Sequence, residues 1–415
     1  MKHLSSLTAA LLTTVAATQA QAVEIEVAYG YSATFDLTIE RIMQDFARAH
    51  PDITVTFRAT YENYEDATNT VLREAVAGTL PDVSFQALNR QALLVERGIV
   101  KPLDPFIANE PDFETEGYHK AMLDLSTFDG MIYGLPFSVS TPISFFNMDI
   151  LRAAGVETVP ATWDEVIEVC HKIKATTDKE PLYWEWNISG NWLLQAAMWS
   201  QGVPMIKDGK LNMDNPEGLK ALELAKAIFQ DCGMKNVIGG DAAKTLAAGD
   251  LGMFFSSTAY VGFVDRSKIG DWEFVTAPYP GIDGAPQALP AGGNSAMLTS
   301  QSGDPEVLQA AWEFIKFATS GEGAATVALT TGYVPPNRVA NALLMDDFYA
   351  ANPNKLTAVN QLPLLSEWFA YPGDNGLAVT QVIEDHLESI FVGDAGDMEA
   401  LRDEMVAEVN ALLPR

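Results

Sequence analysis

Aromatic residues with hydroxyl, amide or carboxylate groups beside them recur in the predicted loops of this sequence. A ring face stacks on the CH groups of a sugar or polyol, while hydroxyls and carboxylates hydrogen-bond its OH groups. Each aromatic residue taken singly fits a hydrophobic core equally well, so the prediction of a site for a polyhydroxylated ligand depends on the whole set. The set comprises Tyr31 with Ser32, 61–65, 183–187 with Trp192, 256–258, Gly332 with Tyr333, and 368–371.

The familiar motifs of covalent chemistry are absent from the sequence. It contains no G-x-S-x-G, H-E-x-x-H or Walker A pattern, and the pair Gly292 and Gly293 is too weak a signal for a nucleotide site. The five histidines lack partners for a triad, and no Cys/His cluster has zinc spacing. We therefore expect no metal and no cofactor. The enzymatic alternative is a secreted carbohydrate-active hydrolase, in which Glu65 and Glu185 would lie ~5–9.5 Å apart across a cleft.

Alternating strand and helix patterns at the start of the chain determine where these loops lie. Residues 24–29, 53–57 and 81–85 have strand patterns, whereas 36–50 and 64–77 have helical spacing of apolar residues. This order predicts an α/β fold with a parallel sheet covered by helices. In such open sheets ligands bind beyond the carboxyl ends of the strands.

The remainder of the chain continues the α/β pattern. Residues 134–137 and 143–147 are extended and apolar, and 252–255 are a candidate buried strand. Thr162 is expected to cap a helix that begins at Trp163. No linker is long enough to separate independent domains, so we expect any two lobes to be joined by short crossings. Further helices are predicted over 304–319, 374–392 and 397–413.

The first 22 residues have the three parts of a secretory signal peptide. Lys2 supplies the positive charge, 4–17 is apolar, and Ala20, Gln21 and Ala22 form a small-x-small cleavage site. We expect cleavage after Ala22, with no following cysteine for a lipid anchor. No later run reaches ~18 uninterrupted apolar residues, so we expect a soluble mature protein in the periplasm of a Gram-negative cell.

The charge balance excludes whole classes of partner. The 415 residues carry 26 Lys and Arg against 55 Asp and Glu, a formal charge of −29. Removal of Lys2 with the signal peptide leaves 25 against 55, or −30. Nucleic acid and anionic lipid would both meet a repelling surface, so we expect neither as a partner.

The sequence contains only two cysteines, Cys170 and Cys232, each in or at the end of a predicted helix. An oxidising compartment permits a disulfide between them. The alternative is two buried thiols, and the spacing in the sequence leaves both open.

Across almost the whole mature chain, the sequence resembles the periplasmic solute-binding proteins of ABC importers, in the extracellular solute-binding family 1 that binds sugars and polyols. Within this group it is most similar to the glycerol-3-phosphate-binding proteins, through 63–65, 136–142 and 331–335. The stretches that resemble the wider group are 80–83, 98–103, 133–137, 146–149, the P-x-T-W-x-E helix start at 160–165, 249–253 and 292–295.

The resemblance implies the type II periplasmic binding protein fold, with two α/β lobes, a ligand cleft between them and three hinge crossings. We expect these crossings near 141–144, 288–292 and 331–334. The implied lobes are 23–141 with 291–331, and 142–290 with 332–415. Hinge closure on the ligand would then produce the form that an ABC permease in the inner membrane recognises, with the binding protein acting as a monomer.

The resemblance also implies roles for particular residues. Tyr64 and Glu65 would hold ligand hydroxyls, and Trp192 would form an aromatic wall that packs few core atoms. Two positions depart from the family pattern, since Ser189 replaces a second wall tryptophan and Thr380 replaces the phosphate-binding arginine. The complete set of predicted ligand-binding residues is Tyr31, Ser32, Tyr64, Glu65, Gln86, Ser140, Trp184, Trp192, Ser256, Gly292, Gly293, Tyr333 and Thr380.

The departure at Thr380 bears on the ligand. A hydroxyl offers one donor where a guanidinium offers five, and the overall charge opposes a dianion. We therefore expect a neutral polyol, a sugar or a glycerol-containing diester, and weak binding of free glycerol-3-phosphate. Arg338, five residues after Tyr333, is the cation considered as a replacement.

Overall fold

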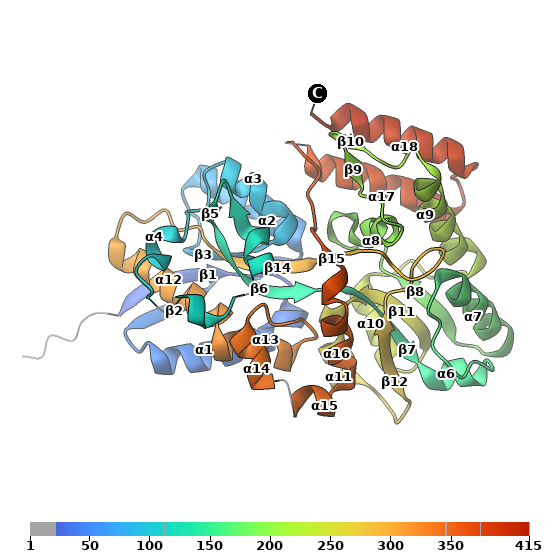
Figure 1. Ribbon diagram of the computed structural model, residues 1–415, viewed down its shortest axis with the longest axis horizontal. Helices are drawn as coiled ribbons and strands as arrows, with labels where there is room; N and C mark the ends of the chain where they lie inside the picture. The colour runs from blue at the N-terminus through green and yellow to red at the C-terminus, as the bar shows by residue number, and fades with distance from the viewer. Residues whose placement is uncertain (1–21, 112, 119, 345–346, 374, 415) are drawn as a thin grey trace, which may run out of the picture.

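The computed structural model describes residues 22–111, 113–118, 120–344, 347–373 and 375–414. The predicted signal peptide lies outside the described residues, apart from Ala22. Two sheets, each covered by helices, lie side by side along the long axis of the molecule (Figure 1).

The first sheet confirms the parallel arrangement predicted from the start of the chain. Its strand order is β2-β1-β3-β14-β6, in which β1 pairs in parallel with β2 and β3, and β14 pairs antiparallel with β3 and β6. Helices α1, α2 and α12 flank it, and α1 begins at Ser32, four residues earlier than the apolar spacing predicts. The bounds are β1 Val23–Ala28, α1 Ser32–Ala49, β2 Ile53–Phe57, α2 Tyr64–Ala77, β3 Val83–Ala87, β6 Gly134–Ser140, β14 Gly292–Leu298 and α12 Pro305–Thr319.

The second sheet is mixed and has the order β12-β7-β11-β8. Strand β8 is parallel to β11, whereas β7 is antiparallel to both of its neighbours. Thr162 and Glu165 form the predicted N-terminal cap of α7, each side chain bonding the other's backbone. The bounds are β7 Pro142–Asn147, α7 Trp163–Thr176, β8 Glu180–Trp184, α8 Trp192–Ser200, α9 Pro216–Lys226, β11 Leu251–Ser257, β12 Phe274–Pro278, α17 Gly376–Val392 and α18 Met398–Leu412.

Short elements complete the two halves. They are η1 Leu88–Arg90, α3 Gln91–Glu96, α4 Asp104–Ile107, η2 Phe113–Glu116, α5 Lys120–Leu123, η3 Asp124–Ser126, β4 Thr127–Phe128, β5 Met131–Ile132, α6 Met148–Ala153, η4 Ser189–Asn191, β9 Ile206–Lys207, β10 Lys210–Leu211, η5 Ala227–Asp231, α10 Gly239–Ala247, η6 Thr258–Tyr260, α11 Val261–Ser267, β13 Leu289–Pro290, α13 Gly321–Thr330, α14 Arg338–Leu344, α15 Phe348–Ala351, α16 Pro353–Asn360, η7 Leu362–Leu364 and β15 Leu365–Ser366.

The chain passes between the sheets through very short segments. Thr141 alone separates β6 from β7, and Ala291 separates β13 from β14. After α13, Val334 pairs with Val139 of β6 and Asn337 pairs with Tyr118, so 334–337 lie beside the first sheet. The chain then reaches the second sheet, where α16 packs on β12 and β7.

Each half has its own hydrophobic core, and a disulfide lies inside the second. Cys170 on α7 is bonded to Cys232, which follows the π-helical segment η5, and both residues are fully buried. Of the two alternatives that the sequence leaves open, the structure therefore has the disulfide.

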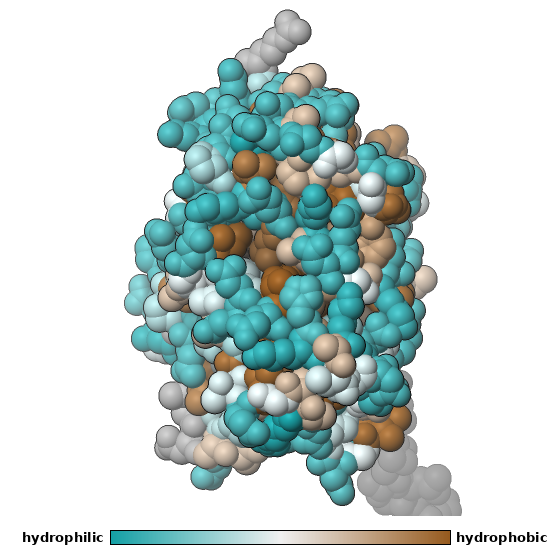
Figure 2. Space-filling view, turned by 90° about the vertical axis from the view of Figure 1, so that its right-hand side faces the viewer, coloured by the Kyte–Doolittle hydropathy of each residue, from teal (hydrophilic) through white to brown (hydrophobic). Residues whose placement is uncertain are grey.

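The face over the second sheet is mostly hydrophilic, with smaller apolar areas between the polar side chains (Figure 2). Within the described residues, the structure contains no helix with both the length and the apolar character needed to cross a membrane.

Candidate functional site

Side chains from both halves meet where the carboxyl ends of the first sheet's parallel strands face the second half. Glu65, in the first turn of α2, accepts hydrogen bonds on both carboxylate oxygens. Arg90 Nη2 donates to Oε1 at 3.1 Å, and the Ser189 hydroxyl donates to Oε2. Arg90 Nη2 also approaches Thr380 Oγ1 to 3.4 Å. Residues 124 and 290 positions apart in the sequence are thus joined through Glu65 and Arg90.

Local backbone geometry positions these side chains. The Asn63 side chain accepts a hydrogen bond from the Asp66 N–H and fixes the start of α2. Gly190 and Asn191 are both left-handed, with φ of 66° and 57°, and this tight turn leads into α8. A Cβ on Gly190 would lie 2.6 Å from Asn89 Nδ2 and 3.4 Å from Trp368 Nε1. A larger residue at position 190 would therefore have to displace the Asn89 side chain, and the left-handed backbone also favours glycine there.

Aromatic rings form a continuous group across the junction. The ring centroids of Tyr31 and Tyr64 are 4.8 Å apart, those of Tyr64 and Trp368 5.9 Å, and those of Trp368 and Trp192 6.2 Å. Tyr333 interacts with Tyr64 through their hydroxyl groups, and its ring stacks on Phe35. A group of aromatic rings with polar tips suits a ligand that has both CH faces and hydroxyls.

Trp192 is more enclosed than the resemblance implies. Its side chain is 2% exposed, and its indole N–H donates to the Ala291 carbonyl at 2.9 Å. A Cβ on Gly292 would lie 2.8 Å from this ring and 2.4 Å from the Ser140 hydroxyl. The expectation that Trp192 packs few core atoms is therefore wrong for this conformation.

Within the described part of the chain, several buried polar atoms near these rings have no hydrogen-bond partner. An unpaired buried donor or acceptor costs free energy, so a group of them in one place indicates a missing partner such as a ligand. Both halves contribute such atoms: Asn89 Oδ1, Arg90 Nε, Ser138 Oγ, Thr258 Oγ1, Asn294 Oδ1 and Trp368 Nε1.

Two carboxyl groups near the junction have raised pKa values. Burial raises the pKa of Glu185 to about 7, although the hydroxyls of Ser256 and Tyr260 donate to its carboxylate. Burial and the nearby Glu65 raise the pKa of Glu384 on α17 to about 7. Burial also raises the pKa of the Tyr31 phenol well above its ordinary value, and Tyr64, Glu65 and Glu185 add to that rise.

The structure brings most of the predicted ligand residues together, with three exceptions. The Ser32 hydroxyl bonds Asp36 within α1. Gln86 is buried in the first sheet, where its amide donates to Ser84. Trp184 lies in the second core, and its indole N–H donates to Tyr279. These three contact their own halves. The residues at the junction are Tyr31, Tyr64, Glu65, Ser140, Trp192, Gly292, Gly293, Tyr333 and Thr380, with Ser256 reaching it through Glu185.

Sequence reasoning missed Arg90, Asn89 and Tyr260. Arg90 ends the short helix η1 that follows β3, so its place soon after a predicted parallel strand was the available signal. Arg338, the cation considered instead, is exposed on α14, and its backbone N–H donates to the Gly117 carbonyl.

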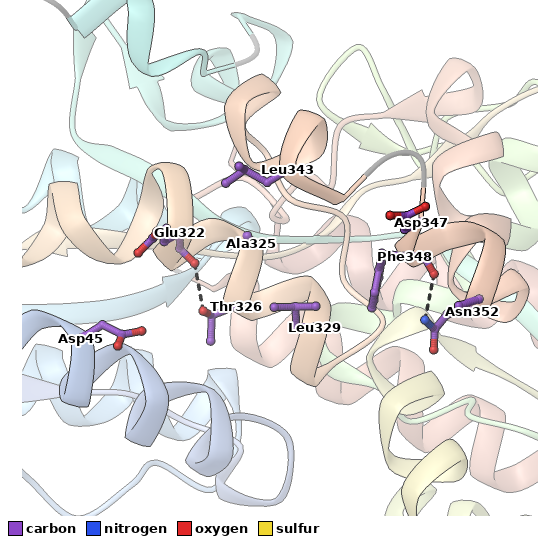
Figure 3. A pocket seen from close by; sticks show the side chains of 10 residues that line it. Asp45, Glu322, Ala325, Thr326, Leu329, Leu343, Asp347, Phe348 and Asn352 are labelled. Atoms are coloured by element: carbon purple, nitrogen blue, oxygen red, sulfur yellow. Dashed lines mark hydrogen bonds between the residues drawn. The ribbon is translucent and has the colours of Figure 1, made fainter.

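A surface pocket of about 590 Å³ contains none of the predicted ligand residues (Figure 3). It lies among α1, α13, α14 and α15, with Asp45, Glu322 and Asp347 around the apolar side chains of Leu329 and Phe348. Among the described residues there is also no group of three or more His, Cys, Asp or Glu that could hold a metal ion.

The sequence matches a known protein family over most of its length. The family model for bacterial extracellular solute-binding proteins matches residues 41–358. The sn-glycerol-3-phosphate-binding periplasmic protein UgpB of Escherichia coli K12 is 25% identical over 408 residues, covering 91% of this chain and 89% of the relative.

Two solved structures share the fold. UgpB from Mycobacterium tuberculosis, in complex with glycerophosphocholine, has a TM-score of 0.82 at 20% identity, covering 94% of this chain and 98% of that one. Maltose-bound MalE3 of T. maritima has a TM-score of 0.81 at 21% identity, covering 94% of this chain and 100% of that one. The junction described above therefore lies within a two-lobed binding-protein fold.

Proposed function

This chain belongs to the bacterial extracellular solute-binding proteins, and we propose that it captures a small polyhydroxylated solute for an ABC importer. The observation that carries the proposal is the group of unpaired buried polar atoms beside aromatic rings between the two lobes. The family works with small-molecule ligands and ABC permeases, which supports the same partners here. The ligand class is a sugar, a polyol or a glycerol-containing diester.

The mechanism follows from the position of the site. Glu65 and Arg90 come from the first lobe, whereas Ser189, Trp368 and Thr380 come from the second. A ligand that contacts both groups binds the closed form better than the open form, so it shifts the population toward closure. The closed form is then the one that the permease recognises, and a single chain is sufficient for it.

We propose three passages between the lobes. The first two are at Thr141 and Ala291, close to where they are expected from the resemblance. We place the third after Asn337, later than 331–334, because Val334 and Asn337 pair with residues of the first lobe. The lobe boundary expected at 331/332 moves accordingly.

We also propose that the protein is exported to the periplasm and cleaved after Ala22. N-terminal sequencing of periplasmic material is expected to begin at Val23. Recovery of Met1 in that material would contradict the proposal.

We propose that this protein binds its solute without converting it. Glu65 is paired with Arg90, and Glu185 is held by Ser256 and Tyr260, so neither carboxyl group is presented as a free acid and base pair. Ligand-stripped protein incubated with labelled glycosides and glycerol diesters should retain one of them stoichiometrically and unchanged. Turnover of a glycoside would support the hydrolase, and loss of that turnover in Glu65→Gln would identify the acid or base.

A further inference from the structure

The last turn of α13 in the first lobe accepts hydrogen bonds from two cations of the second lobe. Carbonyls at the end of a helix have no partner within the helix, and they carry its partial negative charge. Lys355 Nζ donates to the Ala328 carbonyl at 2.9 Å and to the Leu329 carbonyl at 3.1 Å. Arg266 Nη1 donates to the next carbonyl, that of Thr330.

The packing of the helices assigns the two sides of this contact to different lobes. Helix α13 packs on α1, α12 and β6 of the first lobe. Arg266 lies on α11, which packs on α10, and Lys355 lies on α16, which packs on β12 and β7 of the second lobe. These elements meet between the two halves of the molecule (Figure 1). The second lobe therefore caps a helix of the first.

Glycine on each side lets the two backbones approach closely beside these hydrogen bonds. A Cβ on Gly262 of α11 would lie 2.7 Å from the Thr330 carbonyl oxygen. A Cβ on Gly332, just after α13, would lie 1.9 Å from the Thr258 carbonyl oxygen. Arg266 follows Gly262 by one helical turn, so this close approach brings its guanidinium to the end of α13.

The charge of Lys355 is compensated within its own lobe. The side chain is 6% exposed, and burial lowers its pKa to about 8, whereas the nearby Asp265 of α11 opposes this shift. The ammonium is therefore mostly charged at pH 7, and its hydrogen bonds to the carbonyls are charge-assisted. Asp265 belongs to the same lobe, so it offsets the charge whether or not the lobes are in contact.

We propose that Lys355 and Arg266 form a latch that holds the two lobes together even without solute. The proposal rests on the hinge closure proposed above, and neither cation is among the predicted ligand residues. When solute binds the closed form, its apparent affinity falls in proportion to the fraction of molecules that are closed. The latch thus sets the affinity for solute without contacting it.

A purely structural role for the two cations makes a different prediction. If they only completed the end of α13, their replacement would lower the free energy of unfolding and leave the distance between the lobes unchanged. A latch instead changes that distance in the folded protein. A measurement of the distance between the lobes separates the two roles and needs no knowledge of the solute.

The experiment is pulsed electron spin resonance on solute-stripped mature protein with one nitroxide label on each lobe. The labels are attached through Val76→Cys on α2 and Ile238→Cys before α10, both exposed positions. The two native cysteines are bonded to each other and do not compete for the label. The stripped protein with both cations intact should contain a population at the distance that the structure has.

Lys355→Met and Arg266→Gln should each lower the ratio of closed to open molecules on the order of tenfold, because each removes charge-assisted hydrogen bonds. Lys268→Met is the matched control. Lys268 Nζ also donates to a backbone carbonyl, that of Trp272, but within the second lobe. This variant should leave the ratio unchanged.

Each other outcome decides against a stated part. An unchanged ratio in both variants would overturn the latch and leave the cations a structural role. A stripped protein that shows only the open distance with both cations intact would also overturn it, and this result does not depend on a variant that folds. Lobes that separate in the variants of a protein that takes up no solute from a periplasmic extract would support the latch and reject the proposed function.

Discussion

Glu185→Gln should make the stability of this protein less sensitive to pH. The Glu185 side chain is buried at the end of β8, where its carboxylate accepts hydrogen bonds from Ser256 and Tyr260. Burial raises its pKa from 4.5 to about 7. A carboxyl group whose pKa is higher in the folded than in the unfolded state contributes stability below pH 4.5, and this contribution is lost as the pH rises toward 7.

The size of the effect follows from the difference between the two pKa values. One pKa unit corresponds to about 1.4 kcal/mol, so raising the pH from 4.5 to 8 should cost the wild type about 3 kcal/mol through this residue. A glutamine does not ionise. One of the two hydroxyls can still donate to its oxygen, and the other can accept a hydrogen bond from its NH2 group. Other titrating groups affect both proteins alike, so the effect appears in the difference between them.

The assay is urea unfolding at pH 4.5 and pH 8 for the wild type, Glu185→Gln and the exposed control Glu96→Gln. The free energy of unfolding of Glu185→Gln relative to the wild type should rise by about 3 kcal/mol between the two pH values. Glu96→Gln should show no such change. A constant difference between the wild type and Glu185→Gln would refute the reasoning, because it would mean that Glu185 ionises as easily in the folded protein as in the unfolded chain.

Three further changes test other parts of the structure. Replacing both Cys170 and Cys232 with alanine opens a link between residues 62 positions apart and should lower the free energy of unfolding by about 4 kcal/mol in urea; an unchanged value would contradict the bond. Trp192→Ala should cost about 3–5 kcal/mol, because the ring is 2% exposed, and should weaken solute binding; an unchanged melting temperature would place the ring in solvent. Lys355 on α16 donates to the Ala328 and Leu329 carbonyls at the end of α13, across the lobes. Lys355→Met should lower stability by roughly 1–3 kcal/mol in thermal unfolding, whereas the exposed control Lys120→Met should not. Equal melting temperatures for the wild type and Lys355→Met would contradict a stabilising role for these hydrogen bonds.

Local patterns in the sequence were sufficient for the elements of the first lobe. The alternation at 24–29 and 53–57 and the apolar spacing at 64–77 depend on neighbouring residues, so they predict β1, β2 and α2 closely. The same kind of local signal, Thr162 three residues before Glu165, predicts the start of α7.

The arrangement of the site depends on contacts that no local pattern reports. Arg90 and Thr380 are 290 positions apart, and only the packing of the two lobes against each other brings them together. The sequence shows that threonine stands at position 380, where the resembling family has arginine. It does not show that the Arg90 side chain reaches the Thr380 hydroxyl from the other lobe. Trp184 and Trp192 have similar sequence surroundings, yet Trp184 ends the edge strand β8 and lies in the second core, while Trp192 meets Trp368 at the junction.

Native mass spectrometry of the protein purified from the periplasm without denaturation tests the central claim most directly. We predict a population that carries one small molecule per chain, which is released unchanged on denaturation and rebinds to the stripped protein. Stripped protein that takes up no solute from a periplasmic extract, or that returns its bound molecule chemically altered, would contradict the assignment as a solute-binding protein.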